Sequence, residues 1–130
     1  MNQKLALQAA VSLAGLVPVT AGTLGAIDPR WLALAGAAPT LTHAAYLSGL
    51  LLGIGLAFWS LVPGIERQGR VFTVLSAIVA LGGLARLWMA VHMGAGGASV
   101  VLPLVMELGV TPALWAWQRR VARSFNSPPE

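Results

Sequence analysis

Four long apolar runs dominate the sequence, separated by short segments that contain most of its charged residues and many of its glycines and prolines. The runs cover about residues 5–24, 43–62, 71–93 and 99–117. At about 1.5 Å per helical residue, each run matches a hydrocarbon core of about 30 Å. Because backbone polar groups find no water in a bilayer, such runs predict helices. The pattern therefore predicts an all-α, integral membrane four-helix bundle: one domain over residues 1–123, followed by a disordered tail over residues 124–130.

Composition agrees with a membrane protein and removes several other classes. Of the 130 residues 57% are hydrophobic and 9% are charged, whereas about 25% is usual in soluble domains. The net charge of +4 does not indicate nucleic-acid binding, because seven of the eight basic residues stand at or beyond the ends of apolar runs and the eight form no basic stripe. The absence of cysteine excludes disulfides, iron–sulfur centres and thiol nucleophiles.

The first apolar run admits a second interpretation. A basic start, an apolar centre and the small residues at positions 19–21 before Gly22 also resemble a secretory signal peptide with its cleavage site. Within the same run Pro18 is expected to kink the helix or help to end it. The alternatives are therefore a first membrane span and a signal peptide.

The distribution of basic residues predicts the orientation in the membrane. One side of the predicted bundle collects Lys4, Arg67, Arg70, Arg119, Arg120 and Arg123. The other side has Arg30, which is offset by Asp28. The positive-inside rule then places both termini in the cytoplasm.

Two charged residues interrupt the last two apolar runs. Arg86 lies about 22 Å along the third helix, and Glu107 lies about 12 Å from the start of the fourth. On antiparallel neighbouring helices these depths differ by less than one turn, so we expect an intramembrane ion pair. The pair either fixes helix packing or forms the floor of an outward-facing cavity for an anionic headgroup, a small carboxylate or a proton. Pro112, just after Glu107, is expected to free the carbonyl of Leu108 and kink the fourth helix.

Glycines mark the expected helix contacts. Gly49 and Gly53 are four residues apart and share one face of the second helix, where another backbone can approach closely. Packing within the chain and a dimer interface both fit this spacing. Gly82 and Gly83 are expected helix-packing positions in the third helix, where Gly82 and Ala85 make room beside Arg86.

His43 and His92 both fall at the outer ends of predicted helices. Two histidines on two helices are the minimum ligand set for a bis-histidine haem or a chlorophyll-type pigment. Histidines at the membrane interface contact water far more often than they bind a cofactor. The leading interpretation therefore includes no cofactor. Tyr46 lies one turn from His43 and extends this outer polar cluster.

Several stretches resemble a known family. They are Tyr46-Leu47-Ser48-Gly49, Ile65-Glu66-Arg67-Gln68-Gly69-Arg70, Leu81-Gly82-Gly83-Leu84-Ala85-Arg86, Glu107 and Trp117-Gln118-Arg119-Arg120. In these the chain resembles the small four-helix bacterial membrane proteins of domain-of-unknown-function family 4345. The resemblance covers nearly the whole chain and implies a bacterial inner-membrane protein, but it brings no activity, ligand or catalytic residue, and the histidines are not part of the pattern.

Together these observations favour a non-enzymatic accessory or binding protein of the bacterial cytoplasmic membrane. It is expected to contact lipids and to pack against itself, as a homo-oligomer, or against a larger membrane complex. The first alternative is a small transporter or a lipid- or anion-binding protein with Arg86 and Glu107 at its site. The second alternative is a haem- or pigment-binding membrane subunit.

Overall fold

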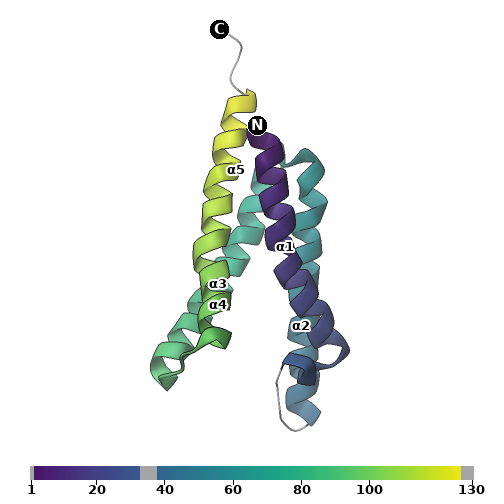
Figure 1. Ribbon diagram of the computed structural model, residues 1–130, viewed down its shortest axis with the longest axis vertical. Helices are drawn as coiled ribbons and strands as arrows, with labels where there is room; N and C mark the ends of the chain where they lie inside the picture. Colours follow the sequence, from purple (N-terminus) through teal and green to yellow (C-terminus); the bar gives the residue numbers. More distant parts are fainter. Residues whose placement is uncertain (1, 33–37, 127–130) are drawn as a thin grey trace. The chain divides into compact units, whose positions relative to one another are not determined.

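A computed structural model of the chain describes residues 2–32 and 38–126 (Figure 1). The described residues form helices only, and no strand occurs among them. In chain order the elements are α1 (Gln3–Ile27), the 3-10 helix η1 (Pro29–Leu32), α2 (Ala38–Leu61), the 3-10 helix η2 (Val62–Gly64), α3 (Gly69–Met93), α4 (Ala98–Val105), the π-helix η3 (Met106–Val110) and α5 (Thr111–Asn126).

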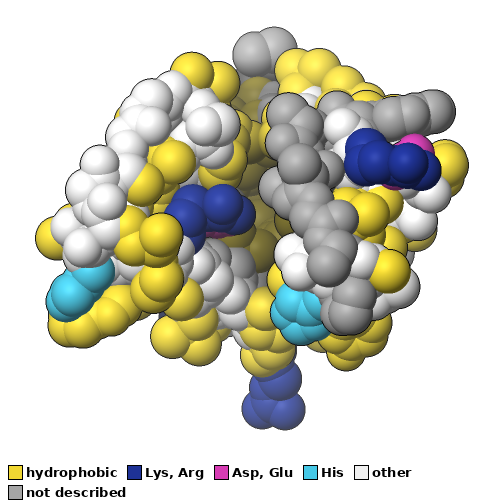
Figure 2. Space-filling view, turned by 90° about the horizontal axis from the view of Figure 1, so that it is seen from below, with side chains coloured by type: hydrophobic (Ala, Val, Ile, Leu, Met, Phe, Trp, Pro, Cys, Tyr) yellow, Lys and Arg dark blue, Asp and Glu magenta, His cyan; other side chains and the backbone are white. Residues whose placement is uncertain are grey.

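Among the described residues, four helical stretches are long and apolar enough to cross a bilayer, as in a multi-pass membrane protein. They are Gln3–Ile27, Thr40–Gly64, Gly69–Met93 and Ala98–Phe125, the last of which combines α4, η3 and α5. Much of the surface in view in Figure 2 is hydrophobic, with few basic side chains. Exposed leucines, valines and tryptophans suit helices that are surrounded by lipid rather than water.

The last helix continues well past the predicted end at residue 117. It reaches Asn126, so the first part of the predicted tail is helical, while residues 127–130 lie outside the described part of the chain. The extension is amphipathic: Gln118 and Val121 are buried and Arg119 and Arg120 are exposed. Hydropathy alone misses such a segment because its inner face contacts protein and its outer face is charged.

The chain divides into two compact units, each considered by itself below. Met1–Gln8 and Gly64–Glu130 form one unit, termed the α3–α5 unit, and Ala9–Pro63 form the other, termed the α1–α2 unit.

In the α1–α2 unit, glycines on both helices bring the backbones together. A Cβ at Gly22 would collide with the backbone of Leu52, and one at Gly55 would collide with Val19 and Pro18. Pro18 does not end α1, which continues to Ile27. At the far end Asp28 Oδ1 accepts the backbone N–H of Arg30 at 3.0 Å, and the 3-10 helix η1 follows. Residues 33–37 lie outside the described part of the chain.

The α3–α5 unit has its apolar core at the end where α3 begins and α5 ends. Leu7, Ile65, Phe72 and Val121 are buried there, together with Gln118, whose Nε2 donates to the carbonyl of Ile65 at 2.8 Å. The segment between α2 and α3 thus contributes an apolar side chain and a carbonyl to the core. At its other end α3 stops at Gly94, whose φ of 61° is a left-handed conformation that glycine adopts without strain.

Candidate functional site

Arg86 and Glu107 form a two-pronged ion pair in the α3–α5 unit. Arg86 Nε donates to Glu107 Oε2 at 3.0 Å, and Arg86 Nη2 donates to Glu107 Oε1 at 3.0 Å. The planar guanidinium fork matches the two carboxylate oxygens, which is the strongest geometry for such a pair. The structure thus brings together the two charged residues that the sequence places inside apolar runs.

Gly83 allows the two segments to approach closely. A Cβ built at Gly83 would lie 2.8 Å from Glu107 Cβ and 2.9 Å from the side chain of Leu108. Gly83 is buried and lies one helical turn before Arg86, so the close contact holds Glu107 within reach of the guanidinium. Gly82, by contrast, has no described atom within 4 Å of a built Cβ and is open.

The ion pair is open to its surroundings on one side. The Arg86 side chain is 45% exposed and that of Glu107 is 18% exposed. Two of the three guanidinium nitrogens are used by the carboxylate. The pair can therefore accept a further polar or anionic group, or a covering helix, without first being broken.

Glu107 stands in a π-helical turn. Pro112 has no N–H for the carbonyl of Leu108, and its ring would clash with that carbonyl in a regular α-helix. The backbone N–H and the Oγ1 of Thr111 both bond the carbonyl of Met106, the hydroxyl at 2.9 Å. The expected effect of Pro112 thus takes the form of a π-helix over Met106–Val110, a feature common at functional sites.

Gly49 and Gly53 make no close contact. No described atom lies within 4 Å of a Cβ built at either position, and the choice between packing within the chain and a dimer interface stays a prediction. The contacts of α2 with α1 run instead through Gly55 and Leu52, and through Trp59.

The two histidines interact with their own helices. His43 stacks on Tyr46 in α2, with ring centroids 6.5 Å apart. His92 lies against Trp88 in α3, with centroids 3.9 Å apart and Nδ1 2.9 Å from the Trp88 carbonyl oxygen. His43 belongs to the α1–α2 unit and His92 to the α3–α5 unit. Within the described residues no group of three or more His, Cys, Asp or Glu could hold a metal ion.

The structure reveals a second ion pair that the sequence analysis missed. Lys4 Nζ lies 3.0 Å from Glu66 Oε1, and the Glu66 side chain is only 8% exposed. The pKa of Glu66 is lowered chiefly by a hydrogen bond from its own backbone N–H and then by Lys4. Lys4 lies at the start of α1, and Glu66 lies just before the start of α3. The two residues are 62 positions apart, and nothing in the sequence indicates that these ends meet.

Glu66 also lines a cavity of about 670 Å³, called here the arginine-lined cavity. Its other lining residues are Arg67, Gly69, Arg70, Thr73, Val74, Arg119, Ala122 and Arg123. In the sequence these arginines act as topology signals, and their grouping at the ends of two apolar runs is also a signal for a cluster.

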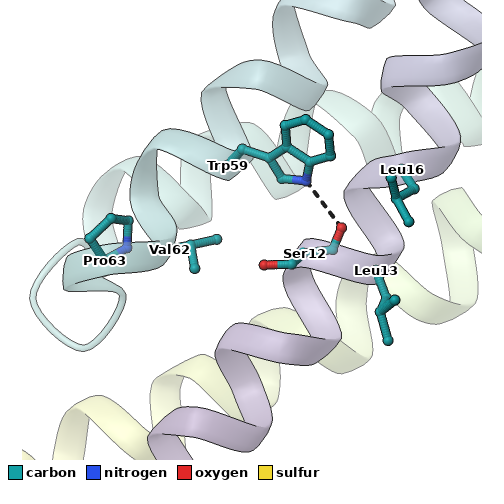
Figure 3. A pocket seen from close by; sticks show the side chains of 6 residues that line it. All are labelled: Ser12, Leu13, Leu16, Trp59, Val62 and Pro63. Atoms are coloured by element: carbon teal, nitrogen blue, oxygen red, sulfur yellow. Dashed lines mark hydrogen bonds between the residues drawn. The ribbon is translucent and has the colours of Figure 1, made fainter.

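A smaller cavity of about 390 Å³ lies in the α1–α2 unit (Figure 3). It is lined by Ser12, Leu13, Leu16, Trp59, Val62 and Pro63. The indole N–H of Trp59 donates to the Ser12 carbonyl at 3.1 Å, and the ring packs on Gly15. The lining is largely apolar and has no titratable group, so this cavity suits an acyl chain or simple packing rather than chemistry.

Comparison with known proteins identifies a family but no individual relative. No curated protein and no solved structure matches the chain. A family described as "Domain of unknown function (DUF4345)" matches residues 6–118, which is most of the chain and includes both Arg86 and Glu107. The protein therefore belongs to the DUF4345 family.

Proposed function

We propose that this protein is a non-enzymatic, multi-pass protein of the bacterial cytoplasmic membrane that acts by association through the face of α3 carrying Gly82 and Arg86. Its partner is a second copy of the chain or a subunit of a larger membrane complex. The observation that supports the proposal most is the ion pair in an apolar span whose arginine is 45% exposed.

The partly exposed ion pair favours a covering protein over lipid at this face of α3. Arg86 lies seven residues before the end of α3, which is about 10 Å into the span. A charged group at such a depth costs a few kcal/mol when it faces lipid. Protein contacts remove this cost if they supply polar partners or exclude lipid from the pair.

Gly82 supports an approaching helix as the cover. It precedes Arg86 by four residues and therefore shares its helix face. Because no described atom lies within 4 Å of a Cβ built there, a second backbone has room to approach beside the ion pair.

Native mass spectrometry of the untagged protein, extracted in the mildest effective detergent, tests this association. We expect a homo-oligomer or a defined complex for the wild type, and its loss in Gly82→Leu. Gly49→Leu is the matched control, because Gly49 is equally open but lies on α2. A wild type that is monomeric and without partners, or dissociation by Gly49→Leu alone, would refute association through the Arg86 face.

A second candidate function is a small transporter or a lipid- or anion-binding protein with Arg86 and Glu107 at its site. The π-helix at Glu107 and the partly exposed guanidinium favour it. Its test is uptake or binding of anionic solutes by reconstituted protein. If Glu107→Gln abolishes that activity while the protein remains folded and associated, this function replaces the purely associative one.

A further inference from the structure

The arginine-lined cavity gathers positive charge from two segments that are far apart in sequence. Arg67 and Arg70 come from the start of α3 and the turn before it, and Arg119 and Arg123 come from the last turns of α5. Four arginines thus surround a cavity of about 670 Å³, within the usual size range of small-ligand sites.

Among the residues that line the cavity, basic side chains outnumber acidic ones. Glu66 is the one acidic residue among those lining it, and its Oε1 is engaged by Lys4 at 3.0 Å. Arg67 Nε lies 4.0 Å from the same oxygen, and the Arg67 side chain is 89% exposed. Even without Arg123, the guanidinium groups of Arg67, Arg70 and Arg119 stand beside one carboxylate that already has a lysine partner, and the resulting excess of positive charge favours an anion.

The backbone adds to this preference. The 25-residue helix α3 begins at Gly69, which lines the cavity, and the side chain of Gln68 at the N-cap makes no capping hydrogen bond. The first N–H groups of a helix carry partial positive charge and bind phosphate well. The cavity therefore combines a helix N-terminus with the guanidinium groups.

Trp115 fixes one wall. Its Nε1 donates to Thr73 Oγ1 at 2.9 Å, and Thr73 donates to the Gly69 carbonyl at 2.7 Å. The guanidinium carbon of Arg119 lies 5.8 Å from the centroid of the Trp115 ring, a cation–π distance that restrains Arg119 at the cavity.

The position along the spans indicates the source of the anion. The cavity extends from Gly69 to Val74, which is about 8 Å from the end of a membrane-spanning helix at the helical rise. Because the apolar run of the third span begins at about residue 71, we expect this level to be that of the lipid headgroups, and Val74 and Ala122 add apolar lining. We infer that the arginine-lined cavity binds the phosphate of an anionic phospholipid headgroup. This site is separate from the Arg86 face and does not depend on the association proposed above.

The test compares two adjacent arginines of equal charge. Arg119 lines the cavity, and Arg120 is exposed but does not line it. The intact chain in mild detergent is titrated with phosphatidylglycerol or with phosphatidylcholine of the same acyl chains, and bound lipid is counted by native mass spectrometry. We expect phosphatidylglycerol to bind preferentially, with affinity about tenfold lower in Arg119→Gln and within twofold of wild type in Arg120→Gln.

Several results would overturn the inference. One is equal binding of the two lipids. Another is an equal loss of phosphatidylglycerol affinity in Arg119→Gln and Arg120→Gln, which would mean that the lipid responds to charge in general and not to this cavity. A parallel titration with inorganic phosphate distinguishes a soluble source: displacement of phosphatidylglycerol by millimolar phosphate would replace the lipid by a free phosphate compound. If Arg119→Gln does not fold, Arg70→Gln gives the same comparison from α3.

Discussion

At the scale of single residues, the ion pair of Arg86 and Glu107 shows which polar contacts a sequence can predict. Each is the only charged residue within its apolar run, and antiparallel helices bring them to similar depth. Few other partners exist, so the pairing follows from topology. Lys4 and Glu66 lie outside the apolar runs, where Glu66 has arginines close in sequence, and their 3.0 Å contact depends on details of helix ends.

The Arg86–Glu107 pair leads to a test by double substitution. Arg86→Leu leaves the Glu107 carboxylate without its partner, which costs a few kcal/mol if the carboxylate stays ionised. Arg86→Leu with Glu107→Leu removes both charges, so we expect the double variant to be the more stable. Thermal unfolding in one detergent measures the difference, and equal melting temperatures would contradict a direct pair.

Glu66 predicts a dependence of stability on pH. Its folded pKa lies below the ordinary value, so it stabilises the fold above a pH of about 4.5, and this contribution is lost as pH falls through the folded pKa. We expect the wild type to lose stability below that pH more steeply than Glu66→Gln. At pH 7 the variant should be less stable by roughly 1–2 kcal/mol. Parallel pH profiles for the two proteins would show that Glu66 carries no such linkage.

At the scale of the helices, hydropathy located the spans but not their exact ends or their local distortions. The first predicted run, residues 5–24, lies within α1, and the third, residues 71–93, nearly equals α3. The fourth helix differs most, since its last turns are polar outside and buried inside. The π-helix follows from Pro112, whose missing N–H predicts a disturbance, whereas its form depends on the bonds of Thr111 to Met106.

Two adjacent glycines of α3 provide a matched test of helix contact. Alanine favours a helix by up to about 1 kcal/mol over glycine, so Gly82→Ala should be neutral or slightly stabilising. A Cβ at Gly83 meets Glu107 and Leu108 at under 3 Å, so Gly83→Ala should destabilise by roughly 1–3 kcal/mol. Thermal unfolding of both variants checks this. Similar effects at the two positions would mean that the α3–η3 contact is looser than described.

At the scale of the whole molecule, the sequence predicts the number and apolar nature of the helices better than their mutual contacts. Length and hydropathy depend on each segment alone. Four helices of the described chain are long and apolar enough to cross a membrane. Contacts depend on which glycines face a neighbour. Gly49 and Gly53 have the spacing of a contact motif but no described atom within 4 Å of a built Cβ, while Gly22 and Gly55 contact the facing helix without that motif.

Membrane topology is the property of the whole chain that its charges predict most directly. Basic residues gather at both ends of the chain and in the segment between α2 and α3, so the positive-inside rule places these parts in the cytoplasm. The chain has no cysteine, so single cysteines report position without background. In intact cells, a membrane-impermeant maleimide should label Gly96→Cys, in the turn after α3, and not Ser124→Cys near the end of α5. Labelling of Ser124→Cys should appear only after the membrane is permeabilised. The opposite pattern would invert the orientation and place the arginine-lined cavity at the outer leaflet.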